Sequence, residues 1–151
     1  MRKPLSLWII IGLFLFLSVG AIFGGTQLII DPSGKMLQMP LFFIQTPNSS
    51  FSDYFYPGII LFVCNGLLPL FVIYSLLFRP KFPILQKINP FKQFYWAWTL
   101  SGVVGVGILI WIFTEIYMTF YYPILQLPFV ALGSIVILLT LMPSVRAYYL
   151  K

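Results

Sequence analysis

The pattern of apolar and polar positions divides the chain into four long apolar stretches. They cover, approximately, residues 5–25, 57–78, 94–120 and 123–145. Only the third stretch contains a charged residue, Glu115. Each stretch has the roughly 20 residues that a helix needs to cross the roughly 30 Å hydrocarbon core of a membrane, and helices satisfy every backbone group in lipid. The pattern therefore predicts an all-α protein, a transmembrane four-helix bundle formed by a single domain over residues 1–151.

The first stretch has one alternative interpretation, as a secretory signal peptide. Arg2 and Lys3 precede it, as basic residues precede the apolar region of such peptides. Its uncharged part is longer than that region usually is, and Gly20-Ala21 offers only a weak cleavage site. We therefore expect the stretch to stay in the protein as a membrane span.

The composition fits a membrane protein and excludes the most familiar catalytic chemistry. Of the 151 residues, 60% are hydrophobic and 8% are charged, whereas a soluble domain carries about 25% charged residues. The absence of histidine and the single cysteine, Cys64, leave no ligand set for zinc, copper or haem and no Ser-His or Cys-His nucleophile pair. We predict no metal, no cofactor and no enzymatic activity.

The basic residues predict how the chain is oriented in the membrane. If the four spans alternate in direction, eight basic residues share one side: Arg2, Lys3, Arg79, Lys81, Lys87, Lys92, Arg146 and Lys151. The other side holds Lys35 with Asp31 and Asp53. Because basic residues accumulate on the cytoplasmic side, we predict a cytoplasmic membrane protein with both termini in the cytoplasm. The net charge of +6 then reflects topology and not nucleic-acid binding, and the expected partner is the lipid bilayer.

A loop of about 30 residues, 26–56, is the only sizeable segment outside the predicted spans. It is too short for a core of its own, and its apolar runs predict that it packs onto the helices or lies in the interface. One of its sequences is typical of a type I turn: Asp31-Pro32-Ser33-Gly34. Ser52 or Asp53 is placed to cap the second span. We expect these structural roles for both aspartates ahead of a metal or substrate role.

Three motifs around this loop resemble a pattern in small uncharacterised bacterial membrane proteins. The matching residues are Gly24-Gly25, then Asp31-Pro32-Ser33-Gly34, then Phe51-Ser52-Asp53-Tyr54 followed by Pro57-Gly58. Those proteins are similar to this chain in length and in having four predicted spans, although the specific motifs cover only about residues 24–58. The resemblance implies a bacterial cytoplasmic membrane, and it implies no established activity and no catalytic residues.

Small residues and one proline suggest how the spans pack. The pairs Gly20/Gly24 and Ser101/Gly105 have the spacing that lets helices approach closely, either within one chain or in a homo-oligomer. The second span contains a candidate helix break: Asn65, Gly66 and Pro69. A proline there predicts a bend, because it leaves a backbone carbonyl without a partner, and broken helices form ion or substrate sites in some transporters. We expect a simple kink here.

Glu115 is the charged residue that neither topology nor turn chemistry explains. It lies near the outer end of the third span, roughly 7 Å deep at 1.5 Å per residue, where a carboxylate is costly unless it faces water, pairs or is protonated. Trp111 is on the same helix face and Gln126 is at a similar depth in the fourth span, whereas Gln27 and Lys35 reach Glu115 only if the loop folds inward. Glu115 is either a functional acid in an outward-facing cavity or a hydrogen-bonded acid that fixes helix register.

Two functions from different classes follow. The first is a non-enzymatic accessory or interaction protein that packs against a larger membrane protein or modulates lipids, and the scarcity of polar groups favours it. The second is a small proton-coupled transporter or channel that uses Glu115 in an outward-facing cavity. A membrane-embedded enzyme ranks third, because it would need Asp31, Asp53 and Glu115 to converge in one pocket.

Overall fold

The computed structural model describes residues 2–119 and 123–151, and within them it is all-helical. The α-helices are α1 (Leu5–Ile30), α2 (Phe55–Ile60), α3 (Leu68–Phe78), α4 (Pro83–Ile88), α5 (Trp96–Thr119), α6 (Pro123–Leu141) and α7 (Pro143–Tyr149). A π-helical segment, η3 (Leu61–Leu67), joins α2 to α3, and the loop after α1 contains two short 3-10 helices, η1 (Lys35–Leu37) and η2 (Leu41–Phe43). The predicted all-α class is confirmed.

Three helical segments are long and apolar enough to cross a membrane. They are α1, the continuous segment Phe55–Phe78 and α5. Helices α6 and α7 pass the same test only together, and their axes are bent by 60°, so they are a fourth candidate if the bent pair forms one span. The described helices thus fit a multi-pass integral membrane protein.

The bend after α6 differs from the uninterrupted span that we predicted over residues 123–145. Helix α6 ends at Leu141. Met142 has ψ of 140°, which is the extended conformation that a following proline imposes, and Pro143 starts α7. Hydropathy does not register this break because the residues around it are apolar. The predicted end of the third span at Phe120 lies outside the described residues.

Helix α1 is longer than the predicted span, which ended at Gly25. The helix has 26 residues in total and its last residue is Ile30. Asp31 is the C-cap, just before Pro32. A glycine costs a helix about 1 kcal/mol relative to alanine, and packing of α1 against α2 and η3 offsets that cost. The stop signal is therefore the proline and not the glycine pair.

Pro69 widens its helix instead of breaking it. The seven residues before α3 form the π-helix η3, in which the Leu68 N–H donates to the carbonyl of Val63, five residues earlier. A wider turn separates the proline ring from the carbonyl with which it would clash in an α-helix. The predicted kink at Asn65, Gly66 and Pro69 is thus a π-helical stretch within one continuous span.

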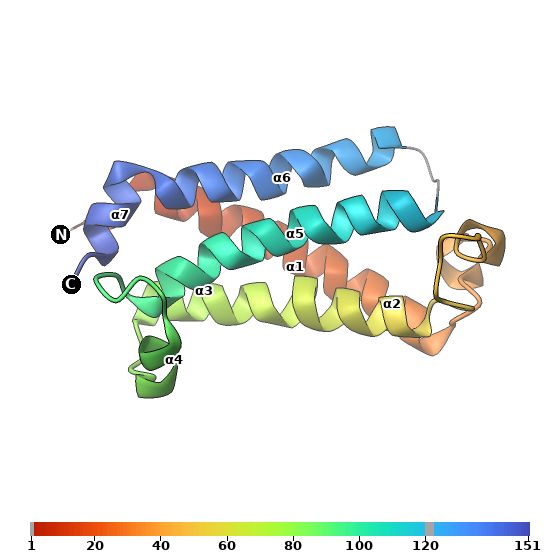
Figure 1. Cartoon of the computed structure of the whole chain (residues 1–151), viewed down its shortest axis with the longest axis horizontal. Coiled ribbons are helices and arrows are strands. Elements are labelled where there is room, and N and C mark those ends of the chain that lie inside the picture. Colours follow the sequence, from red (N-terminus) through yellow and green to blue (C-terminus); the bar gives the residue numbers. More distant parts are fainter. Residues whose placement is uncertain (1, 120–122) are drawn as a thin grey trace.

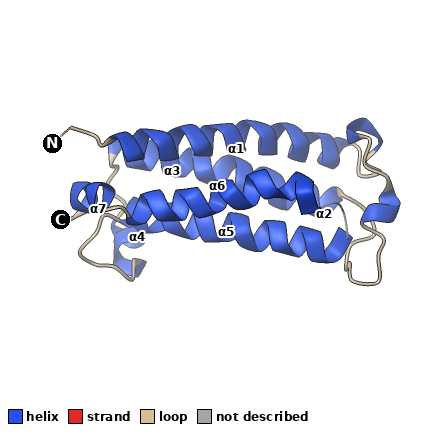
Figure 2. Ribbon diagram, turned by 90° about the horizontal axis from the view of Figure 1, so that it is seen from above, coloured by secondary structure: helices blue, strands red, loops and turns tan. Residues whose placement is uncertain are grey.

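The long helices lie side by side, with the start of α1 near α7 at one end and the loop after α1 at the other (Figures 1 and 2). We call these the α7 end and the loop end. The α7 half contains the main core, whose fully buried members include Leu7, Phe14, Val72 and Val136. A second, smaller core lies at the loop end around Leu28, Ile44 and Tyr54.

Backbone and aromatic contacts hold the α7 end together. The Tyr149 side chain is 1% exposed, and its hydroxyl donates to the Leu76 carbonyl at 2.7 Å. Arg79 donates to the Tyr148 carbonyl at 2.7 Å and places its guanidinium 4.2 Å from the Tyr148 ring centroid. Tyr95 N–H donates to the Tyr149 carbonyl at 3.0 Å. The start of α5 and the end of α3 are thus both tied to α7.

Two glycine contacts join the helices into pairs. A Cβ atom added to Gly25 of α1 would lie 2.9 Å from the carbonyl oxygen of Gly58 in α2. One added to Gly105 of α5 would lie 3.3 Å from the carbonyl oxygen of Gly133 in α6. Since real Cβ atoms rarely come this close, α1 pairs with α2 and α5 pairs with α6 at distances that only glycine allows.

The predicted small-residue pairs take different positions. Ser101 and Gly105 both lie against α6, where the Ser101 hydroxyl hydrogen-bonds to Thr140 at 3.1 Å. A Cβ atom added to Gly20 would meet no atom within 4 Å, and one added to Gly24 would meet only Leu61 at ordinary contact distance. Close packing of α1 therefore falls on Gly25, next to the predicted pair.

Candidate functional site

A cavity of about 1130 Å³ separates the two cores. Its walls come from both helix pairs: α1 with α2 and η3 on one side, and α5 with α6 on the other. Apolar side chains dominate the lining, among them Leu17, Ile60, Ile112 and Phe129. The volume exceeds the range of about 300–1,000 Å³ usual for small-molecule sites, so it is large enough for a lipid-sized molecule.

One wall of the cavity reaches the exposed surface of α1. Exposed residues of that helix, Gly12, Leu15, Phe16, Val19 and Gly20, line it together with buried ones such as Leu17 and Ala21. Gly20 contributes to this opening because no side chain fills the space beside it. The cavity is consequently accessible from the side of the bundle, through the surface that would face hydrocarbon in a membrane.

The loop after α1 covers the cavity at the loop end. Leu37, Met39 and Ile44 line the cavity from the loop end. The loop is tied to the end of α5, since the Thr46 hydroxyl donates to the Met118 carbonyl. The loop therefore connects the α1–α2 pair to the α5–α6 pair at the end where the cavity separates the two pairs.

Two turns give the loop its shape, as the sequence indicated. The Gly34 N–H donates to the Asp31 carbonyl at 3.0 Å, and Gly34 has φ of 74°, a conformation that glycine adopts readily. Asp31 also accepts from the Met36 N–H at 2.9 Å. The Asp53 carboxylate accepts from the Phe55 N–H, the first of α2, at 2.9 Å, whereas Ser52 offers its carbonyl to Gln45. The N-cap position is taken by Tyr54, which makes no side-chain capping bond, so the predicted cap by Ser52 or Asp53 is not formed, and Asp53 satisfies the first helix N–H from the position before the cap.

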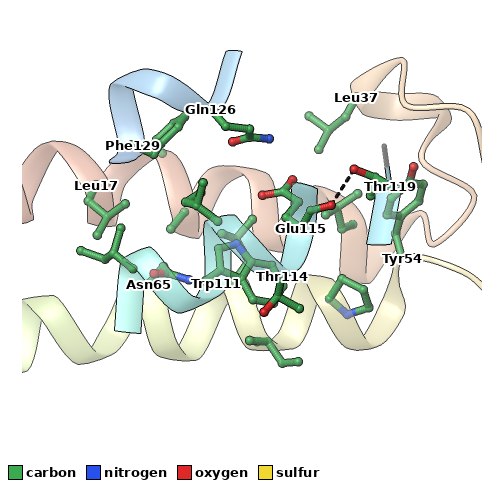
Figure 3. A pocket seen from close by; sticks show the side chains of 18 of the residues that line it. Leu17, Leu37, Tyr54, Asn65, Trp111, Thr114, Glu115, Thr119, Gln126 and Phe129 are labelled. Carbon is green, nitrogen blue, oxygen red and sulfur yellow. Dashed lines mark hydrogen bonds between the residues drawn. The ribbon is translucent and has the colours of Figure 1, made fainter. Parts of the chain in front are cut away.

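Glu115 lines the cavity from α5 (Figure 3). The side chain of Gln126 in α6 also lines the cavity and lies near Glu115 (Figure 3). Trp111, one turn earlier on α5, also lines the cavity and lies beside Glu115. Of the four neighbours predicted for Glu115, the structure therefore brings Gln126 and Trp111 to the same cavity.

The other two predicted neighbours lie elsewhere. Neither Gln27 nor Lys35 lines the cavity, and Lys35 is exposed on the loop. Neither Asp31 nor Asp53 lines it, so the three acids do not converge. No lysine or arginine is present in the described lining, which leaves Glu115 as its single charged group. A carboxylate in apolar surroundings needs a cationic or hydrogen-bond-donating partner, and the described lining offers neutral donors, among them the amides of Gln126 and Asn65.

The π-helix η3 contributes a further polar group to the cavity. Asn65 is 4% exposed as a side chain and lines the wall opposite α6 (Figure 3). Gly66, the next residue, lies against Ile22 of α1, where an added Cβ atom would be 2.8 Å from the Ile22 side chain. The widened turn thus directs the Asn65 amide into the cavity while the glycine keeps α1 close.

Several lining residues carried no signal in the sequence. Phe16, Ile60, Tyr54 and Phe129 read as ordinary apolar or interfacial positions, and only the spacing between the helix pairs makes them a wall. Gly25 and Gly58 determine that spacing and were visible as glycines, although without a partner to indicate which helix they approach.

Comparisons with known proteins identify no relative of this chain: no protein-family model, no curated protein and no solved structure matches it.

Proposed function

We propose that the chain is a four-helix bundle of the bacterial cytoplasmic membrane, with both termini in the cytoplasm, in which α6 and α7 together form the fourth span. Eight of the nine basic residues would then lie on the cytoplasmic side. The loop end, with Asp31 and Asp53, would face outward. This orientation would place the Glu115 cavity in the outer half of the bilayer.

We further propose that the protein is a non-enzymatic accessory protein that binds a membrane amphiphile in this cavity. The observation that carries the proposal is a lipid-sized apolar cavity with a side opening and one acid, Glu115. Its apolar walls suit an acyl or other hydrocarbon chain. Glu115, Gln126 and Asn65 suit a head group that donates hydrogen bonds or carries positive charge, such as an amine. A ligand of this class would enter sideways from the outer leaflet.

The test is photo-crosslinking in liposomes that contain the full chain and a diazirine-bearing long-chain amine. We expect crosslinks on the cavity wall, in α1 between Leu15 and Ala21 and in α5 around Ile112. Glu115→Gln should weaken the apparent affinity about tenfold or more, because a charge-assisted hydrogen bond is lost. The matching long-chain alcohol should crosslink less, and the long-chain carboxylate least. Equal labelling by amine and carboxylate would contradict the proposal.

Two glycine variants provide a matched control. Gly20 and Gly107 both have open space where a side chain would begin, but only Gly20 lines the cavity. Gly20→Phe should occlude the side opening and abolish crosslinking inside, while Gly107→Phe should leave it unchanged. If both variants crosslink like the original chain, the opening beside α1 is not the route of entry.

Proton-coupled transport is the second candidate, favoured by the position of Glu115 on the cavity wall. Transport also needs a path through the α7 half, where Phe14, Val72 and Val136 are fully buried in the core. Amine uptake into proteoliposomes under an imposed proton gradient separates the two functions. Binding without uptake supports the accessory protein. Uptake that depends on the gradient and disappears in Glu115→Gln would establish the transporter instead.

A further inference from the structure

Helix α4 turns two large apolar side chains away from the protein, although Leu85 on its other face packs against the main core. Ile84 is 75% exposed and Ile88 is 69% exposed. Being four residues apart, they share one face of the helix. Phe82 before the helix and Phe91 after it are exposed as well. The segment projects sideways from the bundle at the α7 end (Figure 1), so this apolar face extends beyond the outline of the spans.

The two uncharged polar side chains of the segment, Gln86 and Asn89, point toward the bundle. Gln86 accepts the Trp96 N–H at 3.1 Å and donates to the Phe94 carbonyl at 3.2 Å. Asn89 is 4% exposed, donates to the same carbonyl at 3.1 Å and accepts the Thr99 hydroxyl at 2.8 Å. These four bonds fix how α4 is rotated. The exposure of Ile84 and Ile88 is therefore a built feature and not a consequence of a loosely held loop.

Basic residues surround this face, and no acid accompanies them. Lys81, Lys87 and Lys92 are exposed, and Lys92 reaches back to the carbonyl of Lys87. The sequence contains no aspartate or glutamate from Tyr54 to Thr114. An exposed apolar face with lysines on its border is the pattern of an element that lies in the membrane interface, where lysines meet phosphate groups and apolar side chains enter the acyl region.

We propose that α4 and its flanking residues 81–92 form a binding surface for anionic phospholipids of the leaflet at the α7 end. Ile84 and Ile88 insert below the headgroups, and Lys81 and Lys87 bind the lipid phosphates. The proposal commits to lipid because charge complementarity and the sideways projection of the segment act together, and it does not depend on the cavity or its ligand.

The first test measures which lipids remain bound to the full chain. The protein is released from nanodiscs of equal phosphatidylglycerol and phosphatidylcholine, and the retained lipids are counted by native mass spectrometry. We expect phosphatidylglycerol to predominate. The double variant Lys81→Gln/Lys87→Gln should lower its ratio to phosphatidylcholine about fivefold or more. The control Arg2→Gln/Lys35→Gln removes two exposed charges away from α4 and should retain the ratio. No preference in the original chain, or equal loss in both doubles, would overturn the proposal.

The second test measures insertion. In a Cys64→Ser background, a fluorophore is attached to Ile88→Cys or, as the control, to Gln93→Cys, an exposed position after the helix. In phosphatidylglycerol-containing liposomes, brominated lipid should quench the label at 88 and iodide should quench the label at 93. If iodide quenches both labels equally, α4 lies in water and the proposed surface does not exist.

Discussion

The α7 half and the loop half of this protein are built from the same apolar helices but are packed differently. In the α7 half, core side chains from α1, α3, α5, α6 and α7 meet, and buried hydroxyls such as Tyr149 bond to backbone carbonyls across the helices. In the loop half, each helix pair is closed by glycine contacts, but a cavity of about 1130 Å³ separates the two pairs. Apolar side chains dominate both halves, and the packing between the helix pairs distinguishes them.

This difference suggests that the α7 half stabilises the bundle and that the loop half provides the cavity. The closely packed half resists rearrangement because its interior has no empty space into which side chains could move. It can therefore hold the two helix pairs at a fixed angle. The open half then keeps a cavity that the covering loop spans by bonds to α5. Variants that alter one half at a time test whether the two halves are packed differently.

The largest effect is expected for Tyr149→Ala in the α7 half. The truncation removes a buried ring and its hydroxyl, and the free energy of unfolding should fall by about 3–5 kcal/mol. Tyr149→Phe keeps the ring but leaves the Leu76 carbonyl without its donor, and should cost about 1–3 kcal/mol. Reversible SDS unfolding in mixed micelles measures both. A similar loss for Phe129→Ala on the cavity wall would show that the two halves are equally packed.

A smaller effect is expected at the glycine contact between α1 and α2. In Gly25→Ala the new Cβ atom would lie 2.8–2.9 Å from atoms of Phe62 and Gly58, and the resulting strain should cost about 1–3 kcal/mol. Gly20→Ala, on the same helix with open space beside it, should be neutral or more stable by up to about 1 kcal/mol. Equal stability of the two variants would argue against close packing at Gly25.

Replacing a polar residue by an apolar one should lower the stability in the α7 half but not in the loop half. Thr140→Val in the α7 half leaves the buried Ser101 hydroxyl without its partner and should cost about 1–2 kcal/mol. Glu115→Leu in the loop half removes a charge with no ionic partner in the cavity, so the stability should remain within about 1 kcal/mol of the original or rise. Crosslinking by the long-chain amine should nevertheless be lost. A large loss of stability in Glu115→Leu would assign that acid a structural role.

The smallest effect is a local pH response of the loop. Hydrogen bonds from the Ser33 hydroxyl and the Met36 N–H lower the pKa of the Asp31 carboxyl from its ordinary value of 3.8. Because the folded pKa is the lower one, the stabilisation is complete above pH 3.8 and is lost as the pH falls through the folded value. Hydrogen exchange of the Met36 amide, corrected for intrinsic rates, should accelerate there. Asp31→Asn should not show this pH response, and its persistence would exclude Asp31 as the cause.

The sequence predicted the local features of the fold well, because their causes are local. Uncharged stretches of sufficient length indicated the helices, and Asp31 to Gly34 indicated the turn. Where the prediction of a helix end was wrong, the residue that ends the helix was misjudged. Pro143 interrupts the fourth stretch without any change in hydropathy, and Pro32, not Gly24-Gly25, marks the end of α1.

The sequence also singled out Glu115 and two of its neighbours, since an acid in an apolar helix stands out and helix periodicity places Trp111 beside it. It wrongly admitted Gln27 and Lys35, which only the path of the loop excludes. The sequence placed Asn65 at a helix break but did not indicate that its amide lines the cavity. That position depends on how the π-helix η3 packs against α1.

Residue order alone was enough to predict a helical protein suited to a membrane, the position of the turn after α1 and the one unusual acid. These properties follow from composition, hydropathy and residue spacing. Only the tertiary structure decided that a cavity exists, that Glu115 faces it, and that α4 turns its isoleucines outward. The cavity and the place of Glu115 depend on distances between helices, which glycine contacts such as Gly25 to Gly58 determine across segments far apart in the chain. The rotation of α4 depends on the hydrogen bonds that Gln86 and Asn89 make with residues at the start of α5.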